Sequence, residues 1–85
     1  MALSYKIVQY GVDGSDATKT RVGFSVLEAE TGNQLEVDGL ATTGSNTDEQ
    51  IISAAQANCQ TIIDEWVAST NNIGKTWNPD TNTLE

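Results

Sequence analysis

The fold is decided by residues 20–41, which read TRVGFSVLEAETGNQLEVDGLA. On either side of a polar turn, apolar residues alternate with small or charged ones; they are Val22, Phe24, Val26, Leu35 and Val37. This alternation predicts one strand over residues 20–29 and another over residues 34–41. The connection Glu30-Thr31-Gly32-Asn33 is typical of a hairpin, because Gly32 can take the positive φ that such a turn requires. We therefore expect an antiparallel hairpin at the centre of the chain.

Residues 3–12 predict a further strand on the N-terminal side. With regular alternation, one face would carry Leu3, Tyr5 and Ile7, and the other would carry Val8, Tyr10 and Val12. Turn-forming residues from Asp13 to Asp16 end this strand, and we expect the loop to run on through Lys19. Gly23, inside the second strand, suggests a bulge or a close approach of another backbone.

Residues 47–69 predict one amphipathic helix. Thr47-Asp48-Glu49-Gln50 matches a capping box, and apolar residues then recur at helical spacing. Residues 71–74 contain the asparagines and the glycine that end it. The polar segment 73–85 is expected to form an irregular arm that carries Trp77. Its last two residues, Leu84 and Glu85, fit either a native end or a remnant of cloning.

These elements predict a single α+β domain over residues 1–85, in which one long helix packs on a three-stranded antiparallel sheet. A parallel sheet is disfavoured because only one helix is available for crossovers. The expected core consists of Ile7, Phe24, Val26, Leu35, Val37, Ile52, Ala55, Cys59, Ile62, Ile63 and Trp66.

Composition excludes several classes of function. The chain has 85 residues and a mass of 9.1 kDa, with 4 Lys+Arg against 12 Asp+Glu, a formal charge of −8 and a pI near 4.1. This balance argues against direct binding to nucleic acid or to an anionic membrane surface. No window approaches 18 apolar residues, and the N-terminus lacks the apolar region of a signal peptide. We expect a protein of the cytoplasm or of a particle assembled there.

Catalytic machinery is not visible in the sequence. Histidine is absent and Cys59 is the single cysteine, so neither a Cys/His zinc site nor a Cys–His pair can form within one chain. Asp13–Asp16 lacks the carboxylates of a calcium loop, and Asp64 and Glu65 diverge on the predicted helix. Cys59 lies within the apolar stripe, as a core residue does. We expect no enzyme, no cofactor and no metal; an enzyme would need a carboxylate metal site assembled across subunits.

Apolar surface exceeds what one helix can cover. A helix about 10 Å wide shields part of one sheet face, yet the first strand is apolar on both predicted faces. A folded chain of this mass exposes about 5,000 Å². Because the chain is small and has no internal disulfide, its free energy of unfolding is expected to be low. Contacts with other subunits would then contribute to its stability. We expect a homo-oligomer, or a complex with a larger protein, that buries Val8, Tyr10, Val12 and Trp77.

The closing segment 74–81, Gly-Lys-Thr-Trp-Asn-Pro-Asp-Thr, resembles minor virion proteins of tailed bacteriophages. The opening Tyr-Lys-Ile-Val strand, the single hairpin and the helix with an Asn-Ile-Gly-Lys-Thr-Trp-Asn-Pro-Asp exit extend this resemblance. It implies an accessory structural role, such as capsid decoration or a neck, tail or baseplate component. It brings no catalytic residues.

An alternative function is an acidic inhibitor that mimics nucleic acid and blocks a DNA-binding protein. Such a protein presents rows of carboxylates, and the acids that cluster across the predicted hairpin are Glu28, Glu30, Glu36 and Asp38. Reversing these charges would abolish target binding by a mimic and leave the assembly of a particle component intact.

Overall fold

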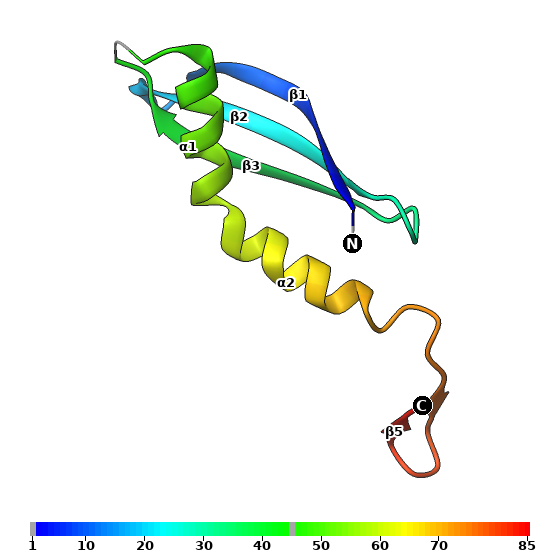
Figure 1. Ribbon diagram of the computed structural model, residues 1–85. Helices are drawn as coiled ribbons and strands as arrows, with labels where there is room; N and C mark the ends of the chain where they lie inside the picture. Colours follow the sequence, from blue (N-terminus) through cyan, green and yellow to red (C-terminus); the bar gives the residue numbers. More distant parts are fainter. Residues whose placement is uncertain (1, 45) are drawn as a thin grey trace.

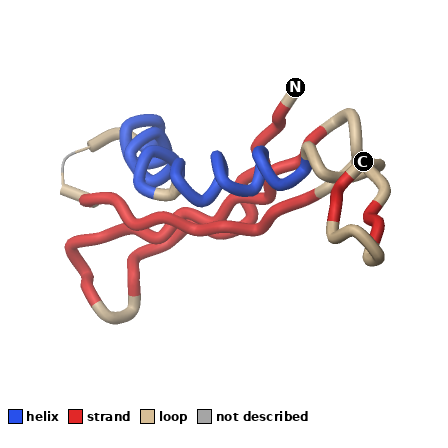
Figure 2. The backbone as a smooth tube through the Cα atoms, turned by 90° about the horizontal axis from the view of Figure 1, so that it is seen from below, coloured by secondary structure: helices blue, strands red, loops and turns tan. Residues whose placement is uncertain are grey.

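The computed structural model describes residues 2–44 and 46–85 of the chain. A three-stranded sheet is followed by two helices and a short two-stranded ribbon (Figure 1). The elements are β1 (Leu3–Asp13), β2 (Asp16–Glu28), β3 (Gln34–Thr42), α1 (Asp48–Asn58), α2 (Gln60–Thr70), β4 (Trp77–Asn78) and β5 (Thr83–Leu84). The sheet is antiparallel in the order β1-β2-β3, and the helices lie on one of its faces (Figure 2). The predicted α+β class and the three-stranded antiparallel sheet are thereby confirmed.

The β2–β3 hairpin is held by the side chain of Glu28, which is buried at the end of β2. Its carboxylate accepts hydrogen bonds from the backbone N–H groups of Glu30 and Thr31, at 2.9 and 2.7 Å, and from the Thr31 hydroxyl at 2.6 Å. Gly32 takes a φ of 75°, as the sequence predicted. The hydrogen bond from the Thr31 hydroxyl, followed by that from the Glu30 N–H, lowers the pKa of the Glu28 carboxyl below its ordinary value of 4.5.

Replacing Glu28 by glutamine is expected to destabilise the protein at neutral pH. The amide removes the charge and places a donor opposite backbone donors. Because the folded-state pKa is lowered, ionised Glu28 stabilises the fold above the ordinary pKa of 4.5, and this contribution is lost as the pH falls through the folded-state value.

Urea unfolding at several pH values measures this effect. The difference in midpoint between the original protein and E28Q should be largest near pH 7 and should shrink below about pH 4. Glu30→Gln, at the exposed position two residues along, is the control. A midpoint difference that does not change with pH would contradict the role given to the Glu28 charge.

The β1–β2 connection is tighter than predicted. Asp13 pairs with Asp16 across a two-residue turn, so β2 begins at Asp16 and the expected loop through Lys19 is wrong. Local side-chain hydrogen bonds explain the difference: the Ser15 hydroxyl donates to Asp13 at 2.7 Å, and the Thr18 N–H donates to Asp16 at 3.0 Å. These polar residues favour turns by bonding nearby backbone groups, and here they hold a long, exposed hairpin tip.

The single helix predicted over residues 47–69 is also wrong, because the helix is interrupted at Cys59. The capping box at Thr47 is present as predicted and starts α1. Cys59 has φ −112° and ψ 11°, outside the helical region, and its N–H bonds the carbonyl of Gln56 at 3.1 Å. Just before the break, the Asn58 amide donates to the Leu40 carbonyl of β3 at 2.6 Å. The interruption sends α2 off in a new direction (Figure 1).

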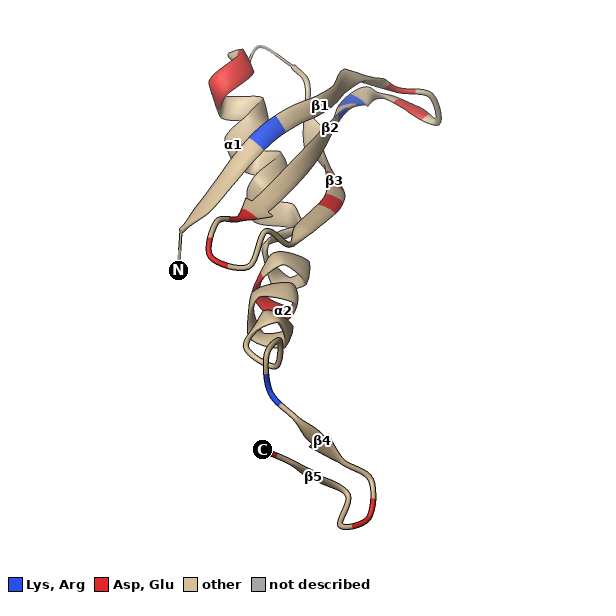
Figure 3. Ribbon diagram, turned by 90° about the vertical axis from the view of Figure 1, so that its right-hand side faces the viewer, with Lys and Arg blue, Asp and Glu red and all other residues tan. Residues whose placement is uncertain are grey.

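The C-terminal arm, residues 73–85, is a small ribbon and not the irregular segment that was expected. β4 pairs with β5, with Trp77 opposite Leu84. Thr76 and Glu85 exchange backbone hydrogen bonds of 2.9 and 2.7 Å at its open end. This ribbon lies beyond α2 and apart from the sheet in Figures 1 and 3.

The core lies between the two helices and the face of β2 and β3. It is formed by Val22, Phe24, Val26, Ala41, Ile51, Ala55, Cys59 and Ile63. Helix α1 approaches β3 most closely at Gly39: a Cβ built there would lie 2.2 Å from the Ala55 carbonyl oxygen. Only glycine leaves room for this contact between backbones.

Five predicted core residues are confirmed as buried: Phe24, Val26, Ala55, Cys59 and Ile63. Four more pack against the core while only partly buried, and these are Leu35, Val37, Ile52 and Trp66. Two predictions are wrong, because Ile7 and Ile62 are exposed. Ile7 lies on the edge strand beside α1, and Ile62 lies on the side of α2 that faces away from the buried Ile63.

The chain is elongated. It measures 56 × 24 × 16 Å with a radius of gyration of 16.6 Å, whereas a compact domain of this length would have a radius of about 12 Å. Its accessible surface is 5576 Å², against about 4,900 Å² for a compact protein of the same mass. The protruding arm and the long β1–β2 hairpin account for this shape (Figures 1 and 3).

Candidate interaction surface

A β-bulge at Val8 decides where the side chains of β1 point. Ile7 pairs with Phe24 and Gln9 pairs with Gly23, so Val8 is an extra residue in β1. Gly23 is needed there, because a Cβ would lie 2.8 Å from the Cβ of Gln9. The bulge suspected from Gly23 is therefore confirmed, although the extra residue belongs to the opposite strand.

The bulge corrects the prediction that Tyr10 and Val12 point away from Tyr5 and Ile7. After one extra residue the alternation is reset, so all four lie on the face that carries the helices. Two contacts show this directly. The Tyr5 ring meets the Phe24 ring edge-on, with centroids 6.2 Å apart, and the Tyr10 hydroxyl donates to the Asp48 carboxylate of α1 at 2.9 Å.

These four residues form an apolar row, which we call the β1 strip: Tyr5, Ile7, Tyr10 and Val12. Helix α1 packs over β3 and reaches β2, so β1 lies beside it. The strip residues are between 37% and 62% exposed, and Val12 is the most exposed. At one end of the strip, the hydrogen bond to Asp48 raises the pKa of the Tyr10 phenol. The strip is thus an uncovered continuation of the core-facing surface of the sheet.

The four residues expected to bind a partner do not form one patch. Tyr10 and Val12 belong to the β1 strip, and Val8 sits at the bulge, 52% exposed. Trp77 lies in the C-terminal arm, opposite Leu84 on the β4–β5 ribbon. Sequence reasoning missed Tyr5 and Ile7 as members of the strip. Gly23 was the signal that could have found them, because a bulge opposite it changes the faces of β1.

The opposite face of the sheet is mostly polar, although Leu27 and Leu40 also belong to it. Arg21 forms ion pairs with Asp13, at 3.2 Å, and with Asp38 on β3. The Ser15 hydroxyl and then the Arg21 guanidinium lower the pKa of Asp13, while the two carboxylates raise the pKa of Arg21. These interactions join all three strands on the face that carries no helix.

The acids proposed for a nucleic-acid mimic do not form an exposed row. Glu28 is buried in the hairpin turn, and Asp38 is paired with Arg21. Only Glu30 and Glu36 of the four remain exposed and outside these interactions. A mimic needs closely spaced, exposed carboxylates to replace phosphates, and these four acids do not supply such a row.

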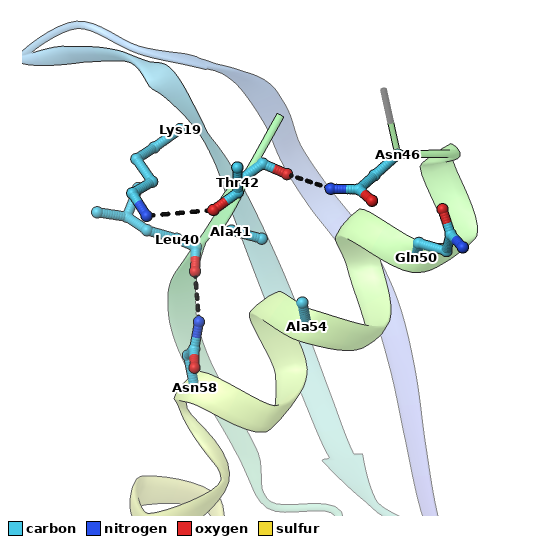
Figure 4. A pocket seen from close by; sticks show the side chains of 8 residues that line it. All are labelled: Lys19, Leu40, Ala41, Thr42, Asn46, Gln50, Ala54 and Asn58. Carbon is cyan, nitrogen blue, oxygen red and sulfur yellow. Dashed lines mark hydrogen bonds between the residues drawn. The ribbon is translucent and has the colours of Figure 1, made fainter. Parts of the chain in front are cut away.

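A shallow pocket of about 310 Å³ lies between β3 and α1 (Figure 4). Its polar side chains bond to β3 from three places: Asn58 on α1, Asn46 in the loop before α1, and Lys19 on β2. Asn58 bonds the Leu40 carbonyl, Asn46 bonds the Thr42 carbonyl at 3.0 Å, and the Lys19 ammonium donates to the Thr42 hydroxyl at 3.3 Å. These three donors already have partners, and the Asn58 bond is the one that holds α1 on β3. Among the described residues that line the pocket, no two groups form a pair suited to acid–base chemistry.

Cys59 lies in the core at the junction of α1 and α2. Its thiol donates weakly to the Gln56 carbonyl at 3.4 Å, and burial raises its pKa. Across residues 2–44 and 46–85, no three His, Cys, Asp or Glu side chains converge as metal ligands would. In the same residues, no helix has the length and apolar character needed to cross a membrane.

The native Cys59 thiol is expected to react with a thiol-specific reagent at least about 100-fold more slowly than the same thiol in concentrated urea, because reaction requires opening of the core. Absorbance of the released chromophore follows both rates. Equal rates in the two conditions would show that the α1–α2 junction is open and would contradict its packing against the sheet.

Comparison of the chain with protein-family models, curated proteins and solved structures finds no match.

Proposed function

We propose that this protein is a non-enzymatic structural component of a bacteriophage particle, which acts by associating with copies of itself or with a larger virion protein. The observation that carries the proposal is the β1 strip, an apolar surface of four large side chains beside α1 that its own chain leaves uncovered. Water is expelled from such a surface when a partner covers it, and this favours association.

The elongated shape supports an assembled state. The accessible surface exceeds that of a compact chain by about 700 Å², which is close to the area of about 800 Å² that each partner buries in a standard interface. The resemblance of residues 74–81 to minor virion proteins favours a phage particle as the setting.

Particles test the proposed setting. Phage particles released from cells that express this chain are purified on a density gradient, and peptides such as Ile7–Lys19 are quantified against those of the major capsid protein. We expect a fixed copy number per particle through successive gradients. Recovery of the chain only in the particle-free fraction would contradict a virion role, while leaving open the binding of other proteins.

A further inference from the structure

The chain exposes a second apolar surface on its C-terminal arm, which lies beyond α2 and away from the sheet (Figures 1 and 3). In the C-terminal arm, Ile73, Trp77 and Leu84 are between 46% and 56% exposed. Trp77 and Leu84 are cross-strand partners, so their side chains share one face of the β4–β5 ribbon. An exposed tryptophan on a ribbon that projects beyond α2 (Figure 3) is the type of side chain that anchors protein interfaces.

We propose that the C-terminal arm of one copy docks on the β1 strip of a second copy, with Trp77 as the anchor. This inference rests on the proposed self-association and specifies which surfaces meet. Each chain carries one docking surface and one arm. Two copies can therefore exchange arms and cover both surfaces at once, or successive copies can pass the arm to the next in a ring or a filament.

The areas fit this exchange. The surface in excess of a compact chain, about 700 Å², arises from the projecting arm and the uncovered hairpin. Docking an arm on a strip would remove apolar surface of both from water. A contact that buried an area of this size on each copy would exceed what a crystal-type or transient contact buries.

Charges are complementary as well. Among residues 2–44 and 46–85, the ion pairs are those of Arg21 with Asp13 and Asp38. Within these residues, Lys75, two residues before Trp77, takes part in no ion pair. Acidic residues Asp48 and Glu49 stand at the Tyr10 end of the β1 strip. An arm that places Trp77 on the strip can bring Lys75 to these carboxylates, which orients the docking.

The face of β1 is a better docking surface than its edge. β1 is an edge strand and could in principle add a strand from a partner. However, Lys6 and the bulge at Val8 interrupt the regular edge that such pairing needs. The strip, in contrast, continues the apolar face of the sheet that α1 and α2 already cover elsewhere.

Photocrosslinking between isotopically distinct copies tests the proposal. Trp77 is replaced by p-benzoylphenylalanine, which keeps an aromatic group, in both unlabelled and ¹⁵N-labelled protein. The two preparations are mixed in equal amounts, allowed to exchange subunits, irradiated and digested with trypsin. We expect the fragment Thr76–Glu85 of one isotope to be joined to the fragment Ile7–Lys19 of the other, because the second fragment contains three of the four strip residues.

The same probe at Glu36, on the polar face of β3, is the control and should not reach residues 7–19 of another copy. Trp77→Ala should weaken self-association at least tenfold, and Thr81→Ala, in the exposed turn of the same ribbon, should leave it unchanged. Neither side chain belongs to the core, so both variants should keep the circular dichroism spectrum of the original protein.

Three results would overturn the proposal. Crosslinks confined to one isotope would show that the arm folds back on its own chain. An oligomer whose crosslinks from position 77 reach other fragments would overturn the arm exchange and leave the proposed self-association standing. A single chain at every concentration would overturn both.

Discussion

Gly39→Ala is expected to lower the free energy of unfolding by about 2–4 kcal/mol, the range of severe overpacking. The added methyl group would stand 2.2 Å from the Ala55 carbonyl oxygen and 2.9 Å from its carbonyl carbon. Both atoms belong to the backbone of α1, so no side-chain rotation can relieve the contact. The helix must move away from β3, which opens the core between Ile51, Ala55 and the sheet.

Urea unfolding followed by circular dichroism measures this loss. The matched control is Gly11→Ala, a strand glycine on β1 whose added Cβ meets nothing within 4 Å. Alanine there should be neutral or slightly stabilising, because glycine weakens a strand interior. If both variants unfold at the same urea concentration as the original protein, the close contact of α1 with β3 is refuted.

If copies associate as proposed, the double variant Ile7→Glu with Val12→Glu is expected to raise the dissociation constant of self-association by about 100-fold or more. Both residues lie in the β1 strip and are at least 40% exposed, so the isolated chain can accept the charges in water. Covering them with the apolar face of the arm, which carries Trp77 and Leu84, would bury two unpaired carboxylates, which is costly.

Ser4→Glu with Gln9→Glu is the matched control. It adds the same two charges to the same strand, but on the opposite face, where Ser4 pairs with Leu27 and Gln9 with Gly23. Its effect should be limited to weak repulsion in a chain that already carries a charge of −8. Equal weakening of association by the two double variants would mean that net charge, and not the β1 strip, governs assembly.

The central hairpin and the start of the helix could be predicted because their signals are local. Alternation from Val22 to Val26 sets one face of β2, Gly32 fits its turn, and Thr47 and Gln50 form the capping box within four residues. The break at Cys59 could not be predicted, because the apolar spacing continues through it. It accompanies a tertiary contact, the hydrogen bond from Asn58 to the Leu40 carbonyl.

The candidate surface was predicted only in part. One inserted residue moves the side chains of all later residues in the strand to the opposite face of the sheet. Tyr10 and Val12 were expected opposite Ile7, and the bulge at Val8 brings them to the same face. The excess of apolar surface therefore lies beside the helix and not behind the sheet. Gly23 carried the local signal of irregularity, but the strand that would bulge depends on the pairing.

Sedimentation velocity over a wide range of protein concentration tests most directly whether another copy covers this surface. We expect a concentration-dependent species with a mass of at least two chains of 9.1 kDa, with a lower frictional ratio than the elongated single chain. A species of one chain's mass at every concentration, with the drag of a particle 56 Å long, would contradict this expectation.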